Sequence, residues 1–333
     1  MGTLGIHHVT AISGDPQRTI DFWGGVLGMR LVKRTVNFDD PGTYHFYFGD
    51  GLGRPGTIVT FFPWGREARA GRQGTGQVAV FSLSVPPTSM GFWIQRLLAH
   101  HVAYAPLARR FDEQVLAFRD PDGMAVEIVG HERARARPAW EGGPVPGEHS
   151  VRGVHGVTLW VEDAADTVRL LEGTLGFRTV GEEGGFRRLE TGEGGPGATV
   201  DVRAVAGFWK GKDGAGAVHH VAWRMRDDAT ELALRERLAA EGLHVTEQLD
   251  RQYFRSVYFR EPGGVLFELA TDAPGFTFDE TAEALGESLR LPPWLEPRRA
   301  QLELTLPEIH LPGASLRDAL LSPPTPDVPR DRT

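Results

Sequence analysis

The sequence contains no cysteine among its 333 residues. This absence excludes disulfide bonds, thiolate metal sites and cysteine nucleophiles, so any metal ion must be bound by histidine, carboxylate or water. Apolar runs long enough to span a bilayer are also absent, and the N-terminus lacks a basic segment followed by an apolar one. We therefore expect a cytoplasmic protein that has no membrane partner.

The sequence also has no excess of positive charge. The formal net charge is -8 and the isoelectric point is near 5.9, which gives no electrostatic footprint for nucleic acid. With 41% hydrophobic and 24% charged residues, the composition is that of a soluble globular protein with enough chain for two cores. The expected partner is therefore a small molecule.

What the sequence does contain is an internal repeat. Residues 5–32 align without a gap with residues 153–180, and in this alignment His7 corresponds to His155. A second pair of segments matches in the same way, since RDPDGMAVE, which ends at Glu127, resembles REPGGVLFE, which ends at Glu268. Self-similarity over such lengths is typical of a duplicated domain.

Each half of the chain contains two smaller units of one kind. The first unit opens with an alternating strand (IHHVTAIS), continues with a helix that begins at Asp15, and ends with three strand-like stretches. The same β-α-β-β-β pattern recurs three times, in residues 76–130, 153–205 and 216–271.

These units predict two domains, in each of which two consecutive units pair. The first domain takes residues 1–132 and the second takes residues 151–272, with a linker rich in proline, glycine and charge at 133–150. Residues 273–333 form a C-terminal extension. Within it, ETAEALGESLRL predicts a short amphipathic helix, and the composition of the final residues predicts disorder.

Four such units, with a histidine on a first strand and a glutamate on a last strand after a Pro-Gly turn, resemble the vicinal oxygen chelate superfamily. The resemblance covers residues 5–271. It implies an α+β fold in which paired units form two cupped, incomplete β-barrels, with a divalent metal inside a cup. Strand geometry permits such a site, because alternate side chains of a strand share one face.

Three matching positions in the C-terminal half hold residue types that bind metals: His155, His220 and Glu268. Glu268 interrupts an apolar strand, VLFELA, where an unpaired buried carboxylate is costly. The corresponding positions in the N-terminal half hold His7, Val80 and Glu127. Because valine cannot bind a metal, we predict a single metal site, in the C-terminal domain. We also expect a structural role for nine other histidines, including His8 and His45.

Two histidines and one carboxylate with open coordination positions are typical of non-heme Fe(II) oxygenases, and Mn(II) accepts the same ligands. Within the superfamily, the chain is most similar to ring-cleaving dioxygenases that open hydroquinones, the relatives of extradiol catechol dioxygenases. The similarity is carried by GIHHVT, by the doublet His219-His220, by DRQYFRSVYFREPGG, and by TDAPGFTFDE with LPPWLEPRRAQLE. It implies an aromatic diol and O2 as substrates and an oligomer of identical chains.

The resemblance also places side chains around the substrate, namely Arg251, Tyr258 and His219. Its chemistry makes His219 and Tyr258 candidates for proton transfer and Arg251 a candidate for offsetting anionic charge. His7 and Thr10 are candidates for contacts with the substrate or with the metal ligands. Because neighbours on a strand point to opposite faces, His219 needs a bulge or a rim position to share the side of His220.

Two other functions stay open. If Gly197 matches Gly264, Asp201 stands where Glu268 stands in the last unit, and a fourth carboxylate ligand would fit glyoxalase-type lyases and isomerases. The superfamily also contains antibiotic-sequestering proteins that bind a ligand in the cup without a metal. If the protein is not such a lyase or isomerase, we expect Asp201 and Glu127 to face solvent.

Overall fold

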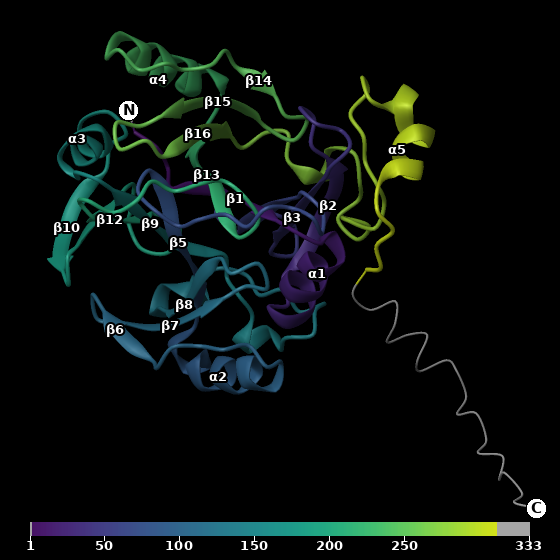
Figure 1. Cartoon of the computed structure of the whole chain (residues 1–333), viewed down its shortest axis with the longest axis horizontal. Coiled ribbons are helices and arrows are strands. Elements are labelled where there is room, and N and C mark those ends of the chain that lie inside the picture. The colour runs from purple at the N-terminus through teal and green to yellow at the C-terminus, as the bar shows by residue number, and fades with distance from the viewer. Residues whose placement is uncertain (1, 312–333) are drawn as a thin grey trace, which may run out of the picture.

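The computed structural model describes residues 2–311 (Figure 1). The first unit contains β1 (Ile6–Ser13), α1 (Pro16–Ile20), a π-helical segment (Asp21–Val26), β2 (Arg30–Val36), β3 (Tyr44–Gly49) and β4 (Ile58–Pro63). The second contains β5 (Gln77–Val85), a 3-10 turn (Pro87–Ser89), α2 (Met90–Ala99), β6 (Ala108–Arg110), β7 (Glu113–Arg119) and β8 (Ala125–Gly130). Two short 3-10 helices connect the halves: Glu132–Ala136 and Gly147–His149.

The second half repeats this order of elements. The third unit contains β9 (Val154–Val161), α3 (Ala165–Gly173), β10 (Arg178–Glu183), β11 (Phe186–Glu190) and β12 (Thr199–Ala204). The fourth contains β13 (Ala217–Met225), α4 (Asp228–Ala240), β14 (Leu249–Asp250), β15 (Arg255–Arg260) and β16 (Leu266–Thr271). The helix of the first unit begins as the sequence predicts, because the Asp15 side chain accepts hydrogen bonds from the backbone N–H groups of Gln17 and Arg18.

The units pair differently from the prediction. β1 pairs antiparallel with β13, so the first and fourth units share one sheet of order β14-β15-β16-β13-β1-β4-β3-β2. β5 pairs antiparallel with β9, so the second and third units share the other, β10-β11-β12-β9-β5-β8-β7-β6. The expected domains 1–132 and 151–272 therefore do not each form one cup. Because β1 and β9 are repeats of each other, the local sequence cannot choose between these two pairings.

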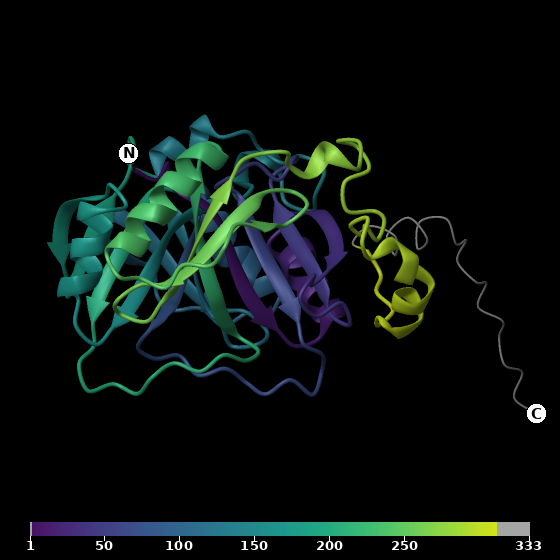
Figure 2. The ribbon, with the colours of Figure 1, turned by 90° about the horizontal axis from the view of Figure 1, so that it is seen from above.

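Both sheets are curled, with the helices on their outside (Figures 1 and 2). One apolar core runs through all four units and includes the fully buried indoles of Trp23, Trp93 and Trp223. The predicted fold class, four β-α-β-β-β units paired into two cups with a C-terminal extension, is confirmed. Within residues 2–311, no helix combines the length and apolar character needed to cross a membrane.

The C-terminal extension lies beside the first unit, at one end of the molecule (Figure 2). It contains two 3-10 helices, Phe276–Phe278 and Glu296–Arg298, followed by α5 (Arg299–Thr305). The helix predicted for residues 280–291 is wrong, since this segment forms turns against β2. Gly286 has φ +83°, and a Cβ there would lie 1.9 Å from the carbonyl oxygen of Leu31. This close approach favours turns over a helix. The predicted disorder falls on residues outside those described.

Candidate metal centre

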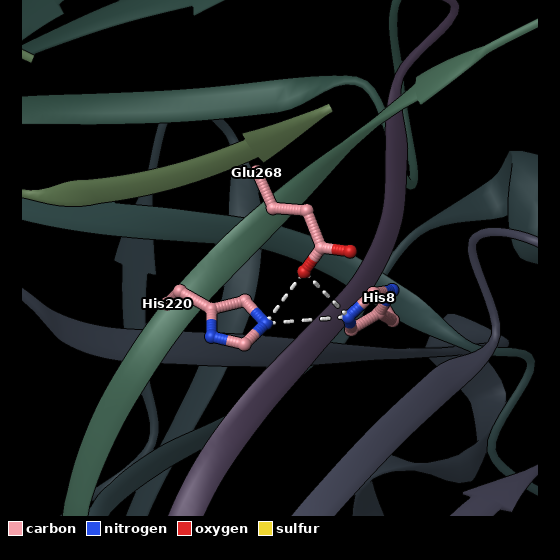
Figure 3. A group of neighbouring side chains, drawn as sticks. All are labelled: His8, His220 and Glu268. Atoms are coloured by element: carbon pink, nitrogen blue, oxygen red, sulfur yellow. Dashed lines mark hydrogen bonds and ion pairs between the residues drawn. The ribbon is translucent and has the colours of Figure 1, made fainter. Parts of the chain in front are cut away.

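Three buried side chains from adjacent strands meet inside the cup of the first and fourth units (Figure 3). They are His8 on β1, His220 on β13 and Glu268 on β16. Oε2 of Glu268 lies 2.8 Å from Nε2 of His220 and 3.3 Å from Nε2 of His8. The two Nε2 atoms are 3.4 Å apart. Three potential ligand atoms therefore face one point.

Each histidine of this group is preceded by a second histidine that it contacts. Nδ1 of His8 lies 2.9 Å from Nδ1 of His7, and Nδ1 of His220 lies 2.7 Å from Nδ1 of His219. The β1–β13 ladder has two register shifts, and the residues it skips are His7 and His219. Such irregularities re-aim side chains, which gives His219 the bulge that its position requires.

The electrostatics of the group fit a bound cation. Burial by itself would raise the pKa of Glu268, but His8 and His220 beside it lower that pKa well below its ordinary value. Glu268 is fully buried, and neither carboxylate oxygen accepts a well-aligned hydrogen bond from the described residues. Because a buried, ionised carboxylate without such partners is costly, a divalent metal between these three side chains would satisfy it.

The outer histidines are suited to hold the inner ones in place. Burial and the neighbouring His8 lower the pKa of His7 to about 3, while burial and His220 lower the pKa of His219 to about 4. Both rings are therefore neutral near pH 7 and can accept a hydrogen bond at Nδ1. When Nε2 of His8 or His220 binds a metal, its Nδ1–H donates to this acceptor, which fixes the tautomer and the ring orientation.

His155, which we predicted as a ligand, lies in the other sheet, so this prediction is wrong. It is on β9, buried, with Nε2 3.2 Å from Oε1 of Glu113. His155 is the repeat counterpart of His7, whereas the residue that joins His220 and Glu268 is His8. The structural role expected for His8 is therefore also wrong. The signal that could have found it is the parallel between the doublets His7-His8 and His219-His220.

The second cup lacks the residues for an equivalent group. The positions that match the three ligands hold Gly156, Val80 and Glu127. A Cβ at Gly156 would lie 2.8 Å from the carbonyl oxygen of Thr199, so the close pairing of β9 with β12 leaves no room for a side chain. Glu127 is held by Arg110 through contacts of 3.0 and 2.6 Å.

Asp201, the hypothetical fourth ligand, also lies in the second sheet. Its two oxygens accept hydrogen bonds of 2.7 and 2.9 Å from Arg188. The expectation that Asp201 and Glu127 face solvent is wrong, because only 3% and 7% of their surfaces are exposed. Ion pairing inside the second cup therefore removes the basis for a four-ligand centre with His220 and Glu268.

A cavity of about 440 Å³ adjoins the three potential ligands, a volume typical of a small-molecule site. It is lined by four of the five residues expected near the substrate, namely Thr10, His219, Arg251 and Tyr258. His7 is instead buried behind His8, with its ring against Phe254. Phe38, Phe62 and Phe254 give the cavity aromatic walls, while His45 and Tyr47 add polar groups that the sequence did not indicate.

Tyr258 and Arg251 form one polar wall of this cavity. Tyr258 is the ladder partner of Glu268, so its ring lies on the same face of the sheet. Its hydroxyl accepts hydrogen bonds of 3.2 Å each from Nε of Arg251 and Oγ of Ser256, which leaves its own proton available for donation. Burial raises the pKa of Tyr258, so the hydroxyl remains protonated near neutral pH. Nη1 of Arg251 lies 3.0 Å from Oδ2 of Asp39.

Comparison with protein families matches residues 5–128 and 153–269 to the Glyoxalase/Bleomycin resistance protein/Dioxygenase superfamily. The chain belongs to this superfamily. The matched residues of this superfamily member span both halves of the repeat, and therefore all four β-α-β-β-β units. The predicted resemblance is therefore confirmed.

Relatives of this superfamily member share nearly its whole length. The "Putative ring-cleaving dioxygenase MhqO" of Bacillus subtilis (strain 168) is 49% identical over 301 residues, covering 90% of this chain and 95% of the relative. The chlorohydroquinone/hydroquinone 1,2-dioxygenase of Sphingobium indicum is 34% identical over 311 residues, covering 91% and 95%. A crystal structure of a "putative dioxygenase" from Bacillus subtilis has a TM-score of 0.89 at 47% identity, covering 93% of this chain and 98% of that one. The predicted placement among the ring-cleaving dioxygenases is confirmed.

Proposed function

We propose that this superfamily member is an Fe(II)-dependent dioxygenase that opens the ring of a hydroquinone-type diol. The observation that carries the proposal is the convergence of His8, His220 and Glu268 beside an aromatic cavity. Two histidines and one carboxylate leave coordination positions open for substrate and O2, as in non-heme Fe(II) oxygenases. The hydroquinone class is supported by the activity named for the Sphingobium relative.

The chain's own residues would bind and orient the diol. When bound, the iron supplies one-electron and O2 chemistry. Phe38, Phe62 and Phe254 line the cavity and would pack against the faces and edges of the substrate ring, excluding water from it. His7 and His219 would hold the two ligand imidazoles in orientation.

Proton transfer falls to Tyr258 in this proposal. Its hydroxyl accepts from Arg251 and Ser256, so its proton can be donated to an oxygen of the substrate as the ring opens. Arg251 supplies a fixed positive charge that stabilises negative charge on the substrate in a cavity with little water. His219, also a candidate for proton transfer, is engaged at Nδ1 by His220, and we assign it the positioning of that ligand.

Anaerobic reconstitution with Fe(II), followed by oxygen-electrode assays, tests the reaction. Hydroquinone, catechol and a methylglyoxal-thiol adduct are offered in parallel, and the same protein is loaded with Mn(II) for comparison. We expect oxygen uptake with a diol, greatest with hydroquinone and Fe(II). The His8→Ala variant should lose bound iron and show no uptake above background, because one of three ligands is gone.

His155→Ala is the matched control, since it removes a buried histidine from the equivalent strand of the other sheet. We expect it to keep the iron content and oxygen uptake of the wild type per folded protein. The opposite pattern, with iron retained in His8→Ala and lost in His155→Ala, would overturn the site. Higher uptake with Mn(II) than with Fe(II) would overturn the choice of metal.

A further inference from the structure

Thr10, His45 and Tyr47 line the cavity and belong to a chain of hydrogen-bonding groups to which the proposed chemistry assigns no role. The Tyr47 hydroxyl lies 2.9 Å from Nδ1 of His45, and Nε2 of His45 lies 2.9 Å from Oγ1 of Thr60. Oγ1 of Thr60 in turn donates to Oγ1 of Thr10 at 2.9 Å. The residues are adjacent because Tyr47 is the ladder partner of Thr60, and Thr60 is the ladder partner of Thr10.

With Thr60 as the donor to Thr10, the direction of the other hydrogen bonds in the chain follows. Because the single Thr60 proton is donated to Thr10, Thr60 must accept from His45, which places a hydrogen on Nε2. A neutral imidazole then accepts at Nδ1, where the Tyr47 hydroxyl donates. Burial, followed by the nearby His8 and His220, lowers the pKa of His45 well below its ordinary value, and burial raises that of Tyr47, in agreement with these protonation states.

This direction leaves one proton unassigned, that of the Thr10 hydroxyl. Among residues 2–311, Thr10 takes part in one side-chain hydrogen bond, as the acceptor from Thr60. Thr10 lines the cavity, follows His8 by two positions on β1, and is the ladder partner of His220. Its free proton is therefore available at the cavity, beside the potential metal ligands.

We propose that His45 is a positioning residue, which fixes the direction of this chain so that Thr10 donates a hydrogen bond to the diol oxygen held at His8, His220 and Glu268. This inference rests on the proposed function. A hydrogen bond from a neutral hydroxyl to an anionic oxygen is short and strong, so it favours the deprotonated form of the bound diol hydroxyl. If His45 only filled space in the wall, its removal would affect folding without any dependence on Thr10.

A double-mutant cycle separates these two roles. Thr10→Val and His45→Phe are made singly and together in the full-length protein, and each is loaded anaerobically with Fe(II). Hydroquinone affinity is measured without oxygen, and kcat/KM with oxygen. We expect unchanged iron content, about a tenfold loss in affinity and kcat/KM for Thr10→Val, and about a threefold to tenfold loss for His45→Phe. The double variant should be no worse than Thr10→Val, because both changes interrupt one interaction.

Three further variants keep the test independent of any single folding defect. Thr60→Val interrupts the chain at another point and should match His45→Phe. His45→Gln offers a carboxamide N–H toward Thr60 and should recover part of the loss. Tyr47→Phe should lose about threefold, since Nδ1 loses its donor. Tyr44→Phe, on the opposite face of the same strand with its hydroxyl bonded to the Pro307 carbonyl, is the matched control and should show no change.

The outcomes distinguish the two proposals. If the losses from Thr10→Val and His45→Phe multiply in the double variant, His45 does not act through Thr10, and the inference is overturned even though the enzyme takes up oxygen. If the wild type takes up no oxygen with any diol, the proposed function fails, and the anaerobic affinities still decide the role of His45. Wild-type protein that binds no diol overturns both.

Discussion

Two buried glutamates of this molecule differ in pKa because different side chains lie next to them. Glu268 is buried beside two histidines, and their proximity lowers its pKa well below the ordinary value. Glu231 on α4 is also fully buried, but its side chain is hydrogen-bonded by the neutral amide of Gln248. Burial raises the pKa of Glu231 to about 7. Near pH 7 the same residue type is therefore ionised in the cup and about half protonated on α4.

Glu231 makes the stability of the fold depend on pH. Its pKa is about 7 in the folded state, whereas an unfolded chain has a glutamate pKa of about 4.3. Protonated Glu231 therefore favours folding below the unfolded pKa, and this contribution is lost as pH rises through about 7. We expect Glu231→Gln to raise the free energy of unfolding by about 2 kcal/mol at pH 8 and to change it little at pH 4.

Urea unfolding of the wild type and of Glu231→Gln at both pH values measures this difference. A surface carboxylate, Glu236 on the same helix, is the control position, since Glu236→Gln should show no such pH dependence. Equal stabilisation by Glu231→Gln at pH 4 and pH 8 would contradict the assignment.

At the scale of elements, the C-terminal extension is fixed to β2 by a buried charge. The Lys33 side chain is fully buried, and its Nζ contacts Glu280 and lies 2.6 Å from Oδ1 of Asp279. The ring of Tyr253 lies 4.8 Å from the same nitrogen. Since Asp279 and Glu280 belong to the extension, these contacts join segments from opposite ends of the chain.

Removing this lysine should destabilise the fold strongly. Lys33→Met keeps most of the side-chain length but leaves two acidic groups without their buried cation. We expect a loss of about 3 to 5 kcal/mol in the free energy of unfolding, measured by urea denaturation at pH 7. The double variant Lys33→Met/Glu280→Gln should recover part of the loss, because it leaves less uncompensated charge. A loss below about 1 kcal/mol for Lys33→Met would show that the ion pairs contribute little.

For the whole molecule, the pairing of the first unit with the fourth divides the candidate metal centre between the two halves of the sequence. His8 comes from β1, whereas His220 and Glu268 come from β13 and β16. The C-terminal half alone would also leave the edge of β13 that pairs with β1 exposed. A site that occupies one cup is therefore built from both ends of the repeat.

A fragment experiment tests this arrangement. Residues 151–311 produced alone should bind no stoichiometric Fe(II) under anaerobic conditions, because one ligand and the partner of β13 are missing. Mixing with residues 1–150 should restore binding. The control is the full chain cleaved within residues 133–150, which should keep its iron because the two sheets hold the halves together. One equivalent of iron in the 151–311 fragment would instead support a site built on His155.

The sequence by itself determined the repeat, the order of elements in each unit and two of the three converging residues. These features are local: strand alternation, the Asp15 cap and the Pro-Gly turn before Glu268 each depend on a few neighbouring residues. The prediction failed for residues 280–291, where contact of Gly286 with Leu31 overrode a helical pattern.

Only the tertiary structure decided which opening strand lies beside β13. β1 and β9 are repeats with the same alternation, so either could pair with β13 at similar local cost, and the choice depends on burial summed over the whole core. That choice places His8 next to His220 and leaves His155 with Glu113. It also places Thr10, the last member of the Tyr47–His45–Thr60–Thr10 chain, beside His220 in the same cavity.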